Sequence, residues 1–181
     1  MIIADQLKKR NRIEYILYMW QVEDIIRAYA CDFDRIKTDY LCRFQFEDEA
    51  QRERTEQWYA DLCNMMHSEG VMKGGHLQIN KNVLQNLTEL HEQLLASANF
   101  PYYKEMYYNV LPYIVELRGK SQDKNEPELQ TCLDALYGVM LLRLQKRTIS
   151  PETEKAVKDI TTLLGQLSDY YLKDQEEPLE F

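Results

Sequence analysis

The side chains best suited to chemistry lie in the first long apolar segment of the chain. Glu23, Asp24 and Arg27 place two carboxylates and a guanidinium close together. They continue the helix side that Leu17 and Trp20 begin. If that side is buried throughout, the charges need hydrogen bonds and could shape a pocket for a small planar or anionic ligand. If it reaches solvent, they form an ordinary charged surface, which is the commoner case.

Two further residues belong to the same hypothesis. His91 lies on a broad apolar helix face, where a histidine is most often a partly buried hydrogen-bonding residue. Tyr107 lies in a run rich in tyrosine, residues 100–113, whose rings could stack on a planar ligand. Packing in the core with a hydrogen-bonded hydroxyl is the commoner role. The predicted lining of a ligand pocket is Glu23, Asp24, Arg27, His91 and Tyr107.

The sequence carries no motif for a catalytic nucleophile, a phosphate-binding loop or a dinucleotide fold. A di-iron site needs Glu-x-x-His pairs, but Thr88 precedes His91 by three residues and Asn64 precedes His67. Convergence of the three histidines in space is not visible in the sequence. We therefore expect no catalytic residue, no metal and no cofactor, and we favour a protein that is not an enzyme.

The element that positions the first three charges is a predicted helix over residues 13–29. Its apolar residues repeat at helical spacing along one face, including Tyr15, Val22 and Ile26. Ile16 and Trp20 form a second apolar patch on the opposite side. A helix that is apolar on two sides is normally enclosed by other helices or by a second subunit.

The remaining pattern predicts helices throughout, with few turn residues between them. Asn80 and Ser150 are expected N-caps, Pro112 is expected to kink or split its helix, and residues 70–80 are expected to form a loop rather than a small hairpin. The result is an all-α protein, a single domain over residues 1–181, packed as an irregular bundle of six to seven helices around the N-terminal one. An acidic tail from about residue 173 is expected to fray. The expected later helices are 32–44, 48–67, 80–98, 100–118, one from 127, and one from 150.

Composition limits the classes of partner. The net charge of −8 disfavours binding to nucleic acid, although Lys8, Lys9, Arg10 and Arg12 form a local basic cluster at a helix start. The four cysteines show no metal-site or disulfide spacing, and we expect reduced packing residues in a cytoplasmic protein. No apolar run approaches the ~20 residues that cross a bilayer, so no membrane contact is expected.

Four segments resemble an uncharacterised bacterial domain-of-unknown-function family of gut anaerobes: EYILYMWQVEDIIRAY, EQWYADLCNMM, GHLQ and NVLPYIVELR. The resemblance covers the whole chain and implies a small helical protein without an assigned activity. We expect a non-enzymatic protein that acts through protein–protein contacts, with a homodimer through the N-terminal helix as one form of contact. The alternative is a small-ligand-binding or enzymatic helical bundle with a core pocket lined by tyrosines and acids.

Overall fold

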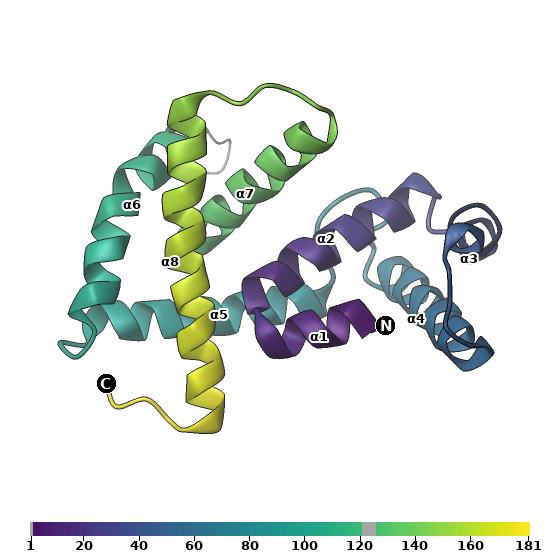
Figure 1. Ribbon diagram of the computed structural model, residues 1–181, viewed down its shortest axis with the longest axis horizontal. Helices are drawn as coiled ribbons and strands as arrows, with labels where there is room; N and C mark the ends of the chain where they lie inside the picture. The colour runs from purple at the N-terminus through teal and green to yellow at the C-terminus, as the bar shows by residue number, and fades with distance from the viewer. Residues whose placement is uncertain (1, 121–125) are drawn as a thin grey trace. The chain divides into compact units, whose positions relative to one another are not determined.

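The computed structural model describes residues 2–120 and 126–181 and confirms the all-α prediction. Within these residues the chain forms eight α-helices, one π-helical turn and one 3₁₀ turn, and no strand (Figure 1). The helices are α1 (Ile2–Arg10), α2 (Arg12–Ala28), α3 (Phe33–Arg35), α4 (Glu49–Ser68), α5 (Gln78–Ala96), α6 (Pro101–Lys120), α7 (Glu128–Leu144) and α8 (Pro151–Glu176).

Contacts within the chain divide it into two compact units. Unit 1 contains the chain up to Lys8 together with Glu14–Asn82, and unit 2 contains Lys9–Ile13 together with Val83–Phe181. The single-domain prediction stays a prediction, because two compact units can still unfold as one.

Unit 1 begins with the helix pair α1 and α2, of which α2 corresponds to the helix predicted over residues 13–29. The break falls at Asn11, whose side-chain oxygen accepts a hydrogen bond from the backbone N–H of Ile13 at 3.0 Å. Both apolar sides of α2 are buried. Ile16 and Ile26 are fully enclosed, and Trp20 is 3% exposed. The predicted two-sided burial of this helix is therefore confirmed within one chain.

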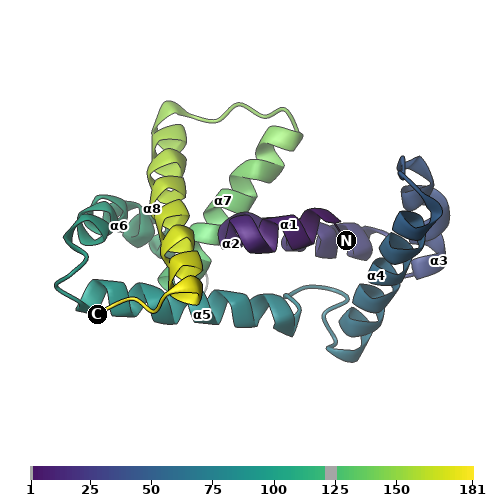
Figure 2. The same cartoon turned by 60° about the horizontal axis from the view of Figure 1, so that its bottom comes forward.

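The middle of unit 1 is less regular than expected. A helix was predicted over residues 32–44, but the chain forms the short α3, a π-helical turn (Ile36–Tyr40) and a 3₁₀ turn (Leu41–Arg43). Asp32 caps this stretch, with its carboxylate accepting the N–H of Arg35. α3 packs beside α4 (Figure 2). The first half of α4 is mostly exposed, and its second half contributes Tyr59, Leu62, Cys63 and Met66 to the core, as its charge pattern indicates.

Residues Gly70–Leu77 form a loop without strands, as predicted. Gly70 and Gly75 have φ angles of 69° and 82°, a left-handed conformation that glycine adopts without steric cost. α5 then begins at Gln78, so the expected N-cap Asn80 lies inside the first turn. Asn80 is buried, and its side chain serves the site described below.

In unit 2, α6, α7 and α8 pack on one another, and α8 stands between α6 and α7 in the view of Figure 1. The core contains Tyr103 and Leu133, both fully buried. Pro112 does not split α6, which continues as a helix from Pro101 to Lys120. Pro112 itself is exposed, so its ring meets no core side chain.

For the C-terminal helix α8, the sequence predicted the start correctly but not the end. Ser150 caps α8 as expected, accepting the N–H of Thr153. The helix continues to Glu176, beyond the point where fraying was expected. After it, the Phe181 ring lies 5.6 Å from the Phe100 ring, and Asn99 donates a hydrogen bond to the Glu180 carbonyl. These contacts hold the tail against unit 2.

Candidate functional site

The charged group of α2 is positioned by helical spacing. Glu23 and Arg27 are four residues apart and Asp24 and Arg27 three apart, so both carboxylates can reach the same guanidinium. Arg27 lies 2.8 Å from Asp24 and 3.8 Å from Glu23. The two acids differ in environment, since the Glu23 side chain is 0% exposed and that of Asp24 is 48% exposed.

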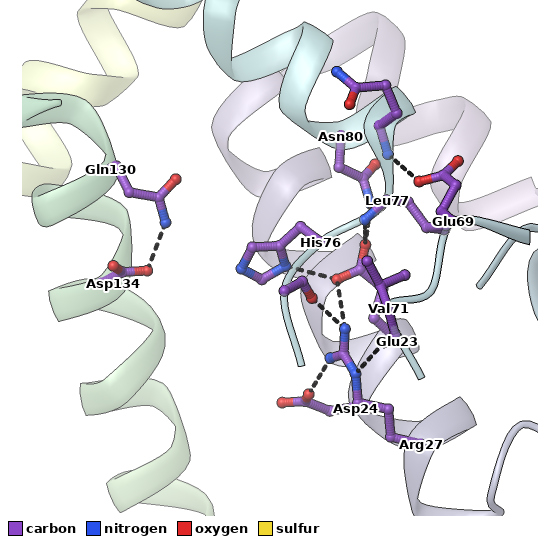
Figure 3. A network of polar contacts seen from close by, with 12 residues as sticks. Glu23, Asp24, Arg27, Glu69, Val71, His76, Leu77, Asn80, Gln130 and Asp134 are labelled. Carbon is purple, nitrogen blue, oxygen red and sulfur yellow. Dashed lines mark hydrogen bonds and ion pairs between the residues drawn. The ribbon is translucent and has the colours of Figure 1, made fainter. Parts of the chain in front are cut away.

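The Glu23 carboxylate is enclosed by donors from the loop and the first turn of α5 (Figure 3). One oxygen accepts the backbone N–H of Leu77 at 2.9 Å and the side-chain amide of Asn80 at 2.7 Å. The other lies 2.7 Å from Nδ1 of His76. The carboxylate therefore lies at the N-terminus of α5, where the unpaired N–H groups and the helix dipole stabilise a negative charge.

Arg27 holds the other side of the same loop. Its guanidinium donates to the Val71 carbonyl at 3.2 Å and to the Gly75 carbonyl. Glu69, at the start of the loop, accepts the backbone N–H of Gln78 at 2.6 Å. Side chains at both ends of the loop thus satisfy its backbone groups, which explains how a glycine-rich segment keeps one conformation.

His76 is more open to solvent than the Glu23 carboxylate that it contacts. Its ring stacks on Trp20, with centroids 4.2 Å apart and planes 14° apart, and 27% of its side chain is exposed. A carboxylate–histidine pair of this geometry can fix the orientation of the imidazole. However, the Glu23 oxygens already receive donors from the chain itself. The arrangement therefore acts as a clamp between α2, the loop and α5.

The other two predicted residues, His91 and Tyr107, lie in unit 2. Nδ1 of His91 is 2.6 Å from the hydroxyl of Tyr103, and both side chains are buried. Burial lowers the pKa of His91 below 6.5, against the opposing effect of Glu128. Burial raises the pKa of Tyr107 to about 12, and a hydrogen bond to Glu128 adds to this effect. His91, Tyr107 and Glu128 therefore form one cluster.

A small cavity of about 330 Å³ opens beside this cluster. Glu128 lies 3.9 Å from Nε2 of His91 and 3.7 Å from the guanidinium of Arg118. Both distances exceed that of a hydrogen bond. Nε2 of His91 and Nε of Arg118 are buried without a hydrogen-bond partner. The cavity is lined by Thr88, His91, Glu92, Leu95, Arg118, Pro127, Glu128 and Leu129.

A larger apolar groove of about 670 Å³ lies among α6, α7 and α8. Leu117, Val139 and Leu142 contribute apolar side chains to it, and Gly138 lies on the same stretch of α7. A Cβ atom added at Gly138 would meet no atom within 4 Å, so this glycine leaves the groove open. The rim carries both signs of charge, among them Glu116 and Arg147. No sequence pattern identified this groove, because its walls come from three separate helices.

The five predicted pocket residues fall into two sets. Glu23, Asp24 and Arg27 are brought together in unit 1, and His91 and Tyr107 in unit 2. The sequence missed the partners of Glu23 and the role of Arg118 and Glu128. A hint lay in the histidine of the GHLQ segment, directly before the start of α5.

The cysteines are all free thiols, as expected. Three are buried, but Cys42 is exposed, so its interpretation as a packing residue is wrong. Leu41 turns inward in the 3₁₀ turn, and Cys42 faces outward beside it. Within residues 2–120 and 126–181, no three His, Cys, Asp or Glu side chains are grouped closely enough to share a metal ion.

Fold and site define an all-helical protein with a buried polar clamp in one unit and an apolar groove in the other. The chain belongs to the family described as Domain of unknown function (DUF4924), which matches residues 1–178. No curated protein and no solved structure matches the chain. In the part of the chain that the structure describes, every helix is too short or too polar to traverse a lipid bilayer.

Proposed function

We propose that this protein is a non-enzymatic cytoplasmic protein that binds another protein, by seating an amphipathic helix of that partner in the apolar groove of unit 2. The groove is the observation that carries the proposal. Its lining combines apolar side chains of α6, α7 and α8 with charged residues that are exposed to solvent. Helix-in-groove recognition uses this combination.

The dimensions of the groove suit a helix. Lining residues recur at spacings of three or four from Asp134 on α7 to Gln145, its C-cap, which corresponds to about 16 Å along the axis. An occupant of about three turns would match that length. The rim of the groove carries both acidic and basic residues, such as Glu116 and Arg147. A partner helix with mixed flanking charges therefore fits best.

A homodimer through the N-terminal helix has less support. Such a contact needs an apolar face that one chain leaves open. The two apolar sides of α2 are instead buried within the chain, with Met19 and Val22 each 1% exposed. The free thiols of Cys31, Cys63 and Cys132 support a reducing compartment.

The experiment is site-specific photo-crosslinking in the native host. A photoreactive residue replaces Leu142 in the groove, and in the matched control it replaces Thr162, which is exposed on α8 outside the groove lining. We expect one partner to crosslink at Leu142 and not at Thr162, through a peptide with apolar residues at helical spacing. The same products at both positions, or a crosslink between two copies of this chain, would contradict the proposal.

Gly138→Met supplies the second part of the test. It fills the groove without backbone strain, since Gly138 has no positive φ angle and no neighbour within 4 Å of an added Cβ. We expect the Leu142 crosslink to disappear in this variant. Gly165→Met on α8 is the matched control, because its Cβ also meets open space and Gly165 does not line the groove. A crosslink that survives Gly138→Met would contradict the proposal.

A further inference from the structure

The cavity beside His91 contains two buried donors that no acceptor of the described chain satisfies. His91 is 4% exposed, and its Nε2 has no hydrogen-bond partner. Nε of Arg118 is also buried without a hydrogen-bond partner. Buried polar groups are nearly always hydrogen-bonded, and each unpaired donor costs free energy. Both groups line the same cavity of about 330 Å³.

The tautomer of His91 follows from its neighbour. The Tyr103 hydroxyl is fully buried, and its hydrogen bond is to Nδ1 of His91 at 2.6 Å. Burial also raises the pKa of Tyr103, so the hydroxyl keeps its proton. A buried O–H needs an acceptor, and Nδ1 is the acceptor within reach. Nε2 therefore carries the ring hydrogen and presents an N–H donor.

An occupant must bring an acceptor that lies between these donors. Glu128 does not serve as this acceptor, because it lies 3.9 Å from Nε2 of His91 and 3.7 Å from the guanidinium of Arg118. A carboxylate has two oxygens that accept from a guanidinium and an imidazole N–H at once. The donor pair thus favours a carboxylate.

The charge of the cavity wall excludes a simple anion as the best ligand. Arg118 supplies one positive charge, whereas Glu92 and Glu128 supply two negative charges. A lone carboxylate would add a third negative charge beside a single guanidinium. A ligand that also carries an ammonium group avoids this repulsion, because the ammonium can pair with an acidic side chain.

We propose that the cavity lined by His91, Arg118, Glu92 and Glu128 binds a small zwitterion of amino-acid type. The carboxylate of the ligand accepts from Nε2 of His91 and Nε of Arg118, and its ammonium donates to the acidic wall. The apolar side chains of Leu95 and Leu129 line the same cavity and leave room for a small apolar substituent. A volume at the lower end of the usual range for ligand sites fits this size.

The test measures binding of the twenty L-amino acids by isothermal titration calorimetry on the full chain. We expect at least one to bind with a dissociation constant of about 1 mM or tighter. For that amino acid, the N-acetyl derivative lacks the ammonium and the decarboxylated amine lacks the carboxylate. Both should bind at least about tenfold more weakly. Acetate binding as tightly as the amino acid, or no amino acid binding at roughly 10 mM, would overturn the proposal.

Variants assign the binding to this cavity. Arg118→Met should weaken binding by at least about tenfold, while Arg143→Met, an exposed arginine of α7, should leave it unchanged. Glu92→Gln provides a variant that folds, because Glu92 is exposed. This substitution should weaken binding of the amino acid and leave binding of the N-acetyl derivative unchanged. Unchanged affinity in both Arg118→Met and Glu92→Gln would overturn the assignment.

Discussion

Glu23 shows how one buried carboxylate helps to fix the conformation of a glycine-rich loop. Its oxygens are hydrogen-bonded to Leu77, Asn80 and His76, which all lie more than fifty positions further along the chain. A buried charge is costly unless it is paired and hydrogen-bonded, and here both conditions are met. Asp24 is adjacent in sequence but half exposed, and it makes an ion pair that solvent screens.

This difference gives a prediction for matched amide substitutions. Glu23→Gln replaces one oxygen by an NH₂ group that faces donors, so it should lower the free energy of unfolding by about 3 kcal/mol. Asp24→Asn should change it by less than about 1 kcal/mol, because the pair with Arg27 is exposed. Urea denaturation followed by circular dichroism measures both. Equal losses in the two variants would show that Glu23 has no special role.

His91 gives a prediction of pH dependence. Burial holds its pKa in the folded protein below 6.5, so the unfolded chain takes up a proton that the folded chain does not as the pH falls below about 6.5. His91 therefore lowers stability at acidic pH, with a slope of at most about 1.4 kcal/mol per pH unit.

The measurement compares the wild type with His91→Gln at pH 7.5 and pH 5.5. Other titrating groups are common to both proteins and cancel in the difference. The stability of the wild type relative to His91→Gln should fall from the higher to the lower pH. A constant or rising difference would mean that His91 titrates alike in the folded and unfolded states.

The sequence singled out Glu23, Asp24 and Arg27, because charges that continue an apolar helix side must either be satisfied or reach solvent. Which of the two applies differs between adjacent residues, and spacing within α2 could not separate Glu23 from Asp24. The donors for Glu23 come from a distant loop. Such long-range partners leave no periodic signal in a sequence.

Among the elements, local signals were reliable where the backbone itself supplies the chemistry. The Ser150-Pro151 pair correctly marked the start of α8, since a cap and a proline act within one turn. The prediction of Asn80 as the N-cap was wrong, because the backbone N–H groups of Leu77 and Gln78 donate to the carboxylates of Glu23 and Glu69. These acceptors let α5 begin earlier. The tail beyond residue 173 stays helical to Glu176, and Glu180 and Phe181 make tertiary contacts with Asn99 and Phe100, which no local rule includes.

The cap of α8 can be tested by deletion of one oxygen. Ser150→Ala removes the acceptor for the N–H of Thr153 and should lower the free energy of unfolding by about 1 kcal/mol. Thr162→Ala is the control in the same helix, because its exposed hydroxyl bonds only to the Lys158 carbonyl one turn back. Thermal unfolding monitored at 222 nm should show a loss for Ser150→Ala and no loss for Thr162→Ala. A cap that contributes nothing would leave the two variants alike.

At the scale of the whole molecule, composition and periodicity were sufficient for the fold class. Few glycines and prolines, together with apolar residues at helical spacing, predicted the all-α architecture that the structure confirms. The grouping of contacts into two units was not foreseen. It depends on which helix faces meet, and side chains of the same apolar type occur on every face.

The two units lead to a prediction about cooperativity. The hydrogen-bond partners of Glu23, namely His76, Leu77 and Asn80, lie in unit 1, so Glu23→Gln should open that unit without loosening α7 and α8. Compact groups of contacts often open as separate cooperative units. Hydrogen exchange read by mass spectrometry should show faster exchange in residues 14–28 and 70–82, and unchanged exchange in 128–144 and 151–176.

Cys132→Ala is the reciprocal variant, because it leaves a cavity at a fully buried position of unit 2. Exchange should then rise in α7 and α8 and stay unchanged in residues 70–82. If either variant raises exchange across the whole chain by the same factor, the two units unfold together. The protein is then one cooperative domain over residues 1–181, as its sequence predicts, since a local defect can spread evenly only when every opening passes through global unfolding.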